Sequence, residues 1–143
     1  MAANSRLTIA VHALTWLALA HRRGTGVLTS EQVAASINTN PVIIRRCLGD
    51  LRRAGLVHVR RGHGAGWSLA RDPKEITLFD VYDAVEHESV FAMHHTEPNL
   101  ECPVGKGIRP VLGTIYSSVD QVVRAKLQCT SIADVLRDTV PSE

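Results

Sequence analysis

The sequence lacks any run of about 20 uninterrupted apolar residues, so it predicts no membrane-spanning segment. The apolar run 7–20 superficially resembles a signal peptide. His12 and Trp16 interrupt it and no small-residue cleavage site follows, so we do not expect this run to be a signal peptide. The chain has only three cysteines, and they are widely spaced. This usage indicates a reducing compartment, the cytoplasm, rather than a scaffold held by disulfides.

Catalytic signatures are also missing. The chain has no phosphate-binding glycine loop, no nucleophile beside a base and no pair of carboxylates at a useful spacing. The one enzymatic arrangement left open is a thiol enzyme that uses Cys102 with His94 or His95. An enzyme is therefore the last of the function classes, and the sequence favours a protein that binds.

Lysine is absent from the N-terminal half, where every basic residue apart from histidine is arginine. Residues 1–71 hold ten arginines and two acidic residues, a net charge of +8, whereas residues 72–143 have a net charge of −6. Such a division usually marks one surface for a polyanion and another for something else. Because arginine suits forked contacts with phosphate and guanine, the first half favours a nucleic acid as partner.

The stretch 40–70 carries the strongest functional pattern. Asn40 is expected to cap a helix that starts at Pro41 and is closed by Gly55. Two short strands should follow, at 56–60 and 67–70, joined by a basic, glycine-rich tip. Arginine-rich helix faces are usually only solvated and glycine-rich hairpins usually only turns. Their adjacency and the charge distribution nevertheless favour the recognition helix and wing of a winged helix-turn-helix. Its core-facing residues would be Ile44, Cys47, Leu48 and Leu51, with Cys47 an inert thiol.

The other segments predict further helices around this stretch. A first helix should run from Ser5 to about Arg22 on a broad apolar stripe. Thr29 and Gln32 have the spacing of a capping box, which starts a short helix that ends near Ile37. Thr77 and Asp80 repeat that spacing before a fourth helix that ends near Val85. The expected fold is therefore mainly α with a small β-hairpin.

A long apolar stripe follows the fourth helix, after a polar loop. The helix is expected from Gly107 for about five turns, and Ser131 should cap a last short helix. The stripe either packs on this chain's first helix or pairs with a second subunit. We favour a homodimer through 108–128, because proteins that read duplex DNA commonly address two half-sites. The stripe comprises Ile108, Val111, Leu112, Ile115, Val119, Val122 and Val123. The predicted division is 1–86 (DNA-binding winged helix-turn-helix), 87–107 (sensor-like loop) and 108–143 (dimerisation helix and short C-terminal helix).

Three segments, in order, resemble a known family. They are similar to segments of the Rrf-two family of bacterial winged-helix transcription regulators. In chain order they read LTSEQVAASINTNPVIIRRCLGDLRRAGLV, RGHGAGWSLAR and ITLFDVYDAVE. That family includes the iron–sulfur cluster regulator, the nitric-oxide-sensing repressor and the repressor of cysteine metabolism. The resemblance covers residues 5–88 by motif and the remainder by architecture. It implies a homodimer that binds a partly palindromic operator in double-stranded DNA, usually as a repressor. The alternative is a protein-interaction module that uses the winged fold without binding DNA.

The resemblance also assigns DNA contacts residue by residue. It places base reading on Asn40, Val42 and Arg45, and the wing on Arg61, Gly62, His63 and Gly64, with Ala65 where the family usually has glycine. Arg45 could fork onto guanine O6 and N7, a contact worth about 1–3 kcal/mol of discrimination. Helix N-termini and short hydroxyls suit phosphates, which adds a second set of candidates. These are Ser5, Arg6, Ser30, Thr39 and Arg46.

The sensor departs from the family pattern. Cluster-bearing relatives place three cysteines close together in the loop, whereas here that loop has only Cys102, with Cys47 and Cys129 far away. We therefore expect no iron–sulfur cluster and no other cofactor. Cys102 before a helix is either a reactive thiol that senses oxidants or a packing residue. His94, His95, Glu97 and Cys102 could form a metal site, but their metal-ligand spacing is not clean, so the prediction is that no metal binds. The signal, an oxidant or a small molecule, stays open.

Overall fold

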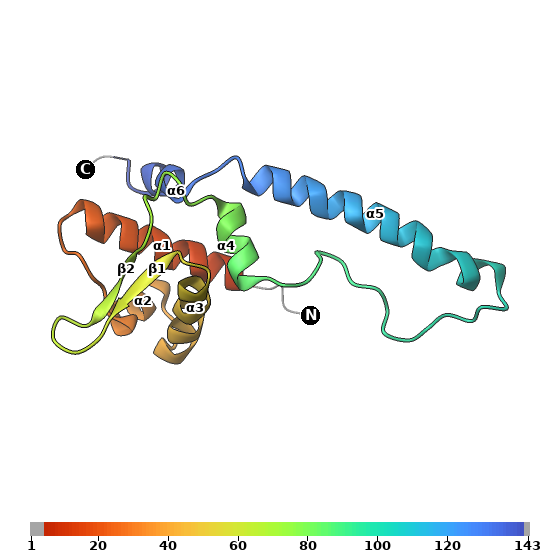
Figure 1. The fold of residues 1–143 in the computed structure, drawn as a ribbon, viewed down its shortest axis with the longest axis horizontal. Helices are drawn as coiled ribbons and strands as arrows, with labels where there is room; N and C mark the ends of the chain where they lie inside the picture. Colours follow the sequence, from red (N-terminus) through yellow and green to blue (C-terminus); the bar gives the residue numbers. More distant parts are fainter. Residues whose placement is uncertain (1–4, 142–143) are drawn as a thin grey trace.

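The computed structural model describes residues 5–141, and its elements follow the order that the sequence predicts. Within this range the fold is mainly helical, with one two-stranded antiparallel sheet, which confirms the predicted fold class. Figure 1 shows a body made of α1 to α4, the hairpin and α6, from which α5 projects. The elements are α1 (Arg6–Arg22), α2 (Ser30–Ile37), α3 (Pro41–Arg53), β1 (Val57–Arg60), β2 (Gly66–Leu69), α4 (Leu78–Val85), α5 (Pro103–Leu127) and α6 (Ile132–Thr139).

The predicted caps fix the starts of the helix-turn-helix. The Thr29 hydroxyl accepts a hydrogen bond from the Gln32 N–H at 3.1 Å, and the Thr29 N–H donates to the Gln32 side chain at 2.8 Å. The Asn40 side chain accepts from the Val42 N–H at 2.8 Å, directly before Pro41. Between the helices, Asn38 takes the left-handed conformation (φ 62°) that asparagine tolerates. These caps fix the residues at which α2 and α3 begin, and so fix which residues of α3 lie on its exposed face.

α1 lies at the centre of the body and contacts α2, α3, α4, α6 and β2. Its Leu14 and Leu17 are buried, and so are Ile44, Leu48 and Leu51 on the inner face of α3, as predicted. Cys47 lies on the same face. Burial, with a smaller contribution from Asp50, raises the pKa of its thiol to about 11, so the sulfur stays protonated at neutral pH. This agrees with an inert core thiol.

The last helix returns to the body instead of staying with α5. α6 packs on α1, and its Ile132 and Leu136 join the core. The connection runs beside the start of α4: the Leu78 N–H donates to the Thr130 carbonyl at 2.9 Å, and the Ile132 N–H donates to the Ile76 carbonyl at 2.8 Å. The predicted unit 108–143 therefore contains two parts that lie in different places, the projecting helix and a core helix (Figure 1).

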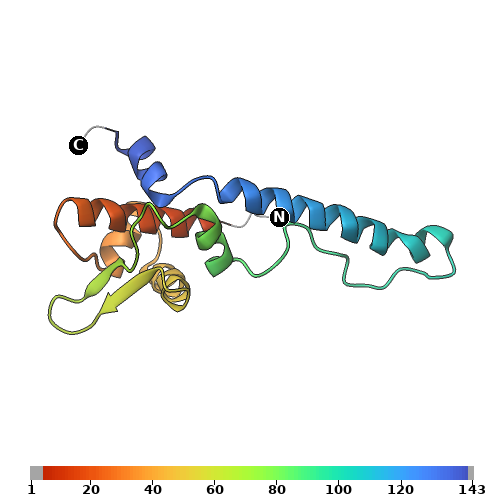
Figure 2. The ribbon, with the colours of Figure 1, turned by 45° about the horizontal axis from the view of Figure 1, so that its top comes forward.

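α5 begins at Pro103, four residues before the predicted start at Gly107. Proline at the first helical position has no N–H that needs a partner, and its fixed φ suits a helix, so Pro103 favours a helix start at that residue. Its 25 residues span about 37 Å, and both views show it extending from the body (Figures 1 and 2). α5 packs on α4, not along α1, and none of its residues is buried. The alternative of packing against the first helix is therefore wrong for this chain. None of the helices between residues 5 and 141 is long and apolar enough to cross a bilayer.

Candidate nucleic-acid interface

The recognition helix and the wing lie on the same side of the body. In Figure 1, α3 and the loop that joins β1 to β2 both lie at the lower edge. They still do in Figure 2, after a 45° turn, so their neighbourhood is not an effect of projection. The first half of the chain thus presents a helix and a hairpin tip together, the arrangement that one groove and an adjacent groove of a duplex would accept.

The exposed start of α3 mixes arginine with apolar side chains. Arg45 and Arg46 are exposed, as are Val42 (52 %) and Ile43 (45 %). Apolar groups there suit the C5-methyl of thymine, and the arginines suit guanine or phosphate. The Asn40 side-chain oxygen accepts the helix-cap hydrogen bond, which leaves its amide NH₂ to donate to a base.

Arg45 is paired across the helix-turn-helix. Its Nη1 lies 3.3 Å from Oε1 of Glu31, which stands in the first turn of α2. Both side chains are exposed, 51 % and 68 %. The sequence does not predict this pair, because the partners are 14 positions apart and only the packing of α2 on α3 brings them together. One signal was present in the sequence: Glu31 and Asp50 are the two acidic residues among residues 1–71.

The wing is a tight, exposed hairpin. β1 pairs antiparallel with β2, and Arg60 stands opposite Gly66 at its end. The tip residues 61–65 are exposed, and Gly62 (φ 79°) and Gly64 (φ 70°) take the left-handed region that glycine allows without strain. Among residues 5–141, Asn38 is the only residue other than glycine with a positive φ. Ala65 therefore takes its place in the tip without backbone strain. Alanine in place of the family's usual glycine therefore leaves the hairpin intact.

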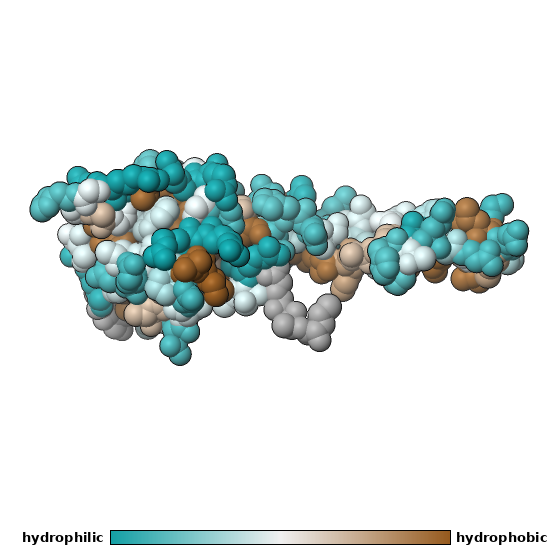
Figure 3. All heavy atoms as spheres, turned by 90° about the horizontal axis from the view of Figure 1, so that it is seen from below, coloured by the Kyte–Doolittle hydropathy of each residue, from teal (hydrophilic) through white to brown (hydrophobic). Residues whose placement is uncertain are grey.

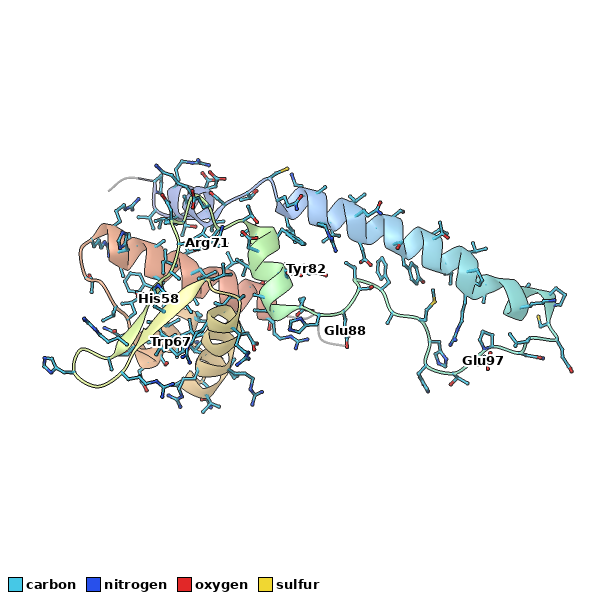
Figure 4. The ribbon with its side chains drawn as sticks, viewed as in Figure 1. His58, Trp67, Arg71, Tyr82, Glu88 and Glu97 are labelled. Carbon is cyan, nitrogen blue, oxygen red and sulfur yellow. The ribbon has the colours of Figure 1, made fainter. Side chains whose placement is uncertain are left out.

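The wing is fastened to the start of α2. The Trp67 indole Nε1 donates to the Ser30 hydroxyl at 3.0 Å (Trp67 is labelled in Figure 4). The backbones also exchange two hydrogen bonds, from the Leu28 N–H to the Trp67 carbonyl at 3.0 Å and from the Trp67 N–H to the Leu28 carbonyl at 2.7 Å. A side chain at Gly66 would collide with the Leu28 carbonyl. The wing is thus held against the start of α2, and both α2 and β1 contact α3.

Ser30 is the one predicted phosphate contact that this geometry speaks against. Its residue is only 7 % exposed, and its hydroxyl already accepts from Trp67. Its place at the start of a helix suggested an outward hydroxyl, but the wing covers it. We leave Ser30 out of the interface.

The other phosphate candidates lie at helix starts and at the edge of α3. Ser5 is exposed at the N-cap of α1 and caps it without a side-chain hydrogen bond. Arg6 follows and forms an ion pair with Glu86 at 3.1 Å. Arg6 and Arg46 line one small cavity of about 120 Å³ between α1 and α3. Thr39 is half-buried directly before α3. The structure therefore brings Arg6 and Arg46 together, although the sequence placed them 40 positions apart.

The loop 86–102 lies along α5 and not in the interface. The Arg109 guanidinium donates to the carbonyls of His94 and Thr96 at 2.7 and 3.1 Å, and the Val90 N–H donates to the Asp120 carboxylate at 3.0 Å. Cys102 is exposed at the N-cap of α5. The N–H groups of Gly105 and, less, Val104 lower the pKa of its thiol, although no side-chain hydrogen bond closes the cap.

The three thiols do not fit an iron–sulfur cluster. Cys47 is buried in α3, whereas Cys102 and Cys129 are exposed at opposite ends of α5, about 37 Å apart along the helix. A cluster needs its thiolates around one small group of atoms. The His94 and His95 rings lie 4.5 Å apart. Within residues 5–141, no three side chains of histidine, cysteine, aspartate or glutamate lie together as a metal site.

Comparisons with known proteins agree with this arrangement. The model of the Rrf2 family (the Rrf-two family above), described as an iron-dependent transcriptional regulator, matches residues 3–138. The chain is 39% identical over 134 residues to YwnA of Bacillus subtilis, assigned as an HTH-type transcriptional regulator, covering 93% of this chain and 96% of YwnA. It is 29% identical over 129 residues to the transcriptional regulator IscR of Cereibacter sphaeroides, covering 90% and 83%. A crystal structure assigned to a DNA binding protein superposes with a TM-score of 0.73 at 34% identity, covering 92% and 99%.

Proposed function

Because the chain belongs to the Rrf2 family of transcriptional regulators, we propose that it binds a partly palindromic operator as a homodimer and represses transcription in the cytoplasm. The family and the relatives named above are regulators, not enzymes. One observation carries the proposal: α3 and the wing stand on the same face, with Arg45, Arg46 and Arg61 exposed. An exposed arginine on each element allows contact with two adjacent grooves.

Each part of the face has a role that follows from its chemistry. Arg45 reads guanine, Val42 contacts a thymine methyl, and Asn40 offers its amide NH₂ to a base. The wing enters the neighbouring groove with Arg61 and His63. Because Gly62 and Gly64 have no side chains, the tip can approach the DNA backbone closely. The phosphate contacts are Ser5, Arg6, Thr39 and Arg46, which fix the register of the protein on the duplex.

The second copy docks on α5. Val104, Ile108, Val111, Ile115 and Val122 are exposed, and their spacing of four, three, four and seven is the heptad spacing of two paired helices. Figure 3 shows brown, hydrophobic residues on the projecting part of the molecule, which is made of α5 and the loop 86–102. The loop covers a different face: Phe91 packs against Tyr116 with the two rings tilted, their centroids 5.4 Å apart. The apolar stripe is thus left open for a partner, and in the proposal that partner is the same stripe of a second subunit.

The signal acts at Cys102 in this proposal. The lowered pKa and full exposure favour the thiolate, which attacks a peroxide and takes one oxygen. The sulfur is oxidised by two electrons to sulfenic acid, and the peroxide's O–O bond breaks with release of hydroxide. No iron–sulfur cluster takes part, since the thiols are too far apart. A small molecule that binds without reacting is the alternative signal.

The experiment is selection of bound duplexes from genomic fragments at several salt concentrations, with and without peroxide. A regulator enriches a common, partly palindromic sequence, and its affinity falls steeply with salt. A protein-interaction module, the competing function, enriches no sequence at physiological salt and forms a complex with another polypeptide. The peroxide arm is repeated with Cys102→Ser. Equal peroxide effects on both proteins would remove Cys102 as the sensor while leaving DNA binding in place.

A further inference from the structure

The first turn of α2 lies between the wing and the recognition helix. On one side its Ser30 hydroxyl accepts from the Trp67 indole, and the adjoining backbone pairs with β2. On the other side its Glu31 carboxylate reaches Arg45 on α3. The capping box of Thr29 and Gln32 fixes this turn from within. Glu31 therefore stands on a backbone that is held from two directions, and its carboxylate approaches Arg45 from a fixed point.

The two acidic residues of the basic half are used differently. Asp50 pairs with Arg53 one turn along the same helix, as solvated helix charges commonly do. Glu31 instead reaches from another helix to the arginine that stands at the predicted base-reading position. Among residues 5–71, only these two acidic residues dilute the positive charge of the face. A carboxylate at this place weakens the attraction of the face to phosphate. Its presence has a purpose if it acts on Arg45.

We propose that Glu31 is a positioning residue for Arg45, which holds its guanidinium ready for guanine and weakens binding to the wrong duplex. This inference rests on the proposed function. The Arg45 guanidinium has five N–H groups in one plane. The Glu31 carboxylate engages Nη1, which leaves the other edge of the guanidinium for the paired acceptors O6 and N7 of guanine.

The same contact supplies discrimination against other sequences. Where guanine is absent, Arg45 cannot fork onto a base and would add its charge to a nearby phosphate. The Glu31 carboxylate competes for that charge and itself repels phosphate. Non-specific binding is therefore lowered more than specific binding, which raises the ratio between them. Glu31 acts through Arg45 and needs no contact of its own with a base.

The test uses the full-length protein and the duplex selected above, with each base pair substituted in turn. The position read by Arg45 is the one whose substitution harms the wild type most and Arg45→Ala least. Glu31→Gln removes the carboxylate charge and Glu31→Asp keeps it but shortens the reach. Glu97→Gln is the matched control: the same charge is lost from the loop beside α5, remote from the helix-turn-helix (Figure 4). Thermal melting of every variant accompanies the binding measurements.

We expect both Glu31 variants to lose about two- to fivefold in discrimination at the Arg45 position, the range of an exposed ion pair. Glu31→Gln should also bind the substituted duplexes more tightly, whereas Glu31→Asp should not. In an Arg45→Ala background neither change should alter discrimination, because the residue through which Glu31 acts is gone.

Three results would overturn the inference. Discrimination in both Glu31 variants equal to that of Glu97→Gln would show that the pair has no part in reading the base. Equal weakening on all duplexes with a lower melting temperature would show that Glu31 only stabilises the first turn of α2. An unchanged effect of Glu31→Gln in the Arg45→Ala background would show that it does not act through Arg45. If the wild type binds no duplex specifically, the proposed function fails, and this inference falls with it.

Discussion

The indole of Trp67 and the hydroxyl of Ser30 are joined by a 3.0 Å hydrogen bond between the wing and the first turn of α2. The two residues are 37 positions apart, and the bond closes over a backbone bridge between Leu28 and Trp67. The wing therefore does not hang from its own two strands alone. Its position relative to the recognition helix is set by contacts with the helix-turn-helix itself.

Trp67→Phe should destabilise the fold by about 1 kcal/mol, because it keeps an aromatic ring but removes the N–H that satisfies the buried Ser30 hydroxyl. Urea unfolding of Trp67→Phe, Ser30→Ala and the double variant measures the coupling. The double variant should lose less than the sum of the two single losses, since either change alone breaks the same bond. Simple additivity would mean that the hydrogen bond contributes nothing to stability.

Arg45→Ala and Arg61→Ala should both weaken operator binding, in different ways. Loss of Arg45 should relax the preference for guanine at one position by about 1–3 kcal/mol. Loss of Arg61, at the wing tip, should weaken binding to all duplexes similarly and lower the salt dependence by about one phosphate contact. Titrations at three salt concentrations separate the two. Arg137→Ala on α6, whose arginine pairs with Asp134 and Asp138, removes the same charge elsewhere and should match the wild type. Unchanged affinity in both test variants would contradict the groove assignment.

Ile115→Glu should convert the dimer to a monomer. Ile115 is 48 % exposed in the single chain, so glutamate costs the fold little, whereas pairing would bury its charge in the apolar stripe of α5. Sedimentation gives the mass of each variant, and circular dichroism checks that the helices remain. Gln121→Glu, exposed on α5 outside the stripe, adds the same charge and should leave the dimer unchanged. A wild type that sediments as a monomer would contradict the assignment of the stripe.

Cys102 should react with iodoacetamide at a lower pH than an ordinary thiol. The N–H groups of Gly105 and Val104 favour the thiolate, so the pKa falls and the thiolate persists to a lower pH than in an unfolded chain. The rate of alkylation against pH, read by mass spectrometry in Cys129→Ser, reports this pKa. An unstructured peptide of residues 97–107 gives the reference, and its midpoint should lie higher. Equal midpoints would mean that the helix start has no effect on the thiol.

The helix caps and turns could be predicted from the sequence, because a cap depends on residues two or three positions apart. The capping box at Thr29 and Gln32, the cap at Asn40 and the glycine-dependent tip all form as predicted. The start of α5 was placed too late, since Gly105 and Gly107 have low helix propensity and weaken the signal in its first turns. Pro103 and the close approach of Asn99 to Gly105 decide where the helix starts.

The contacts between elements were beyond the sequence. Ser30 is covered because Trp67 lies against it, and Glu31 meets Arg45 because α2 packs on α3. Neither fact leaves a mark on the periodicity of α2. The destination of α6 is similar: its cap at Ser131 and its apolar residues predict a helix, but the hydrogen bonds of residues 130–132 with 76–78 direct it onto α1. Helix formation is a short-range property, whereas docking needs the whole core.

The chain leaves the body after Val85 and rejoins it at Thr130, beside the other end of α4. Loop 86–102 and α5 are therefore an out-and-back excursion inserted into an otherwise complete winged helix, whose exit and return points lie one short helix apart. Evolution can exchange or lengthen such an insert without disturbing the core around it. One winged-helix body can thus carry different projecting arms, and a protein with a single cysteine at the far tip of its arm would be one member of such a series.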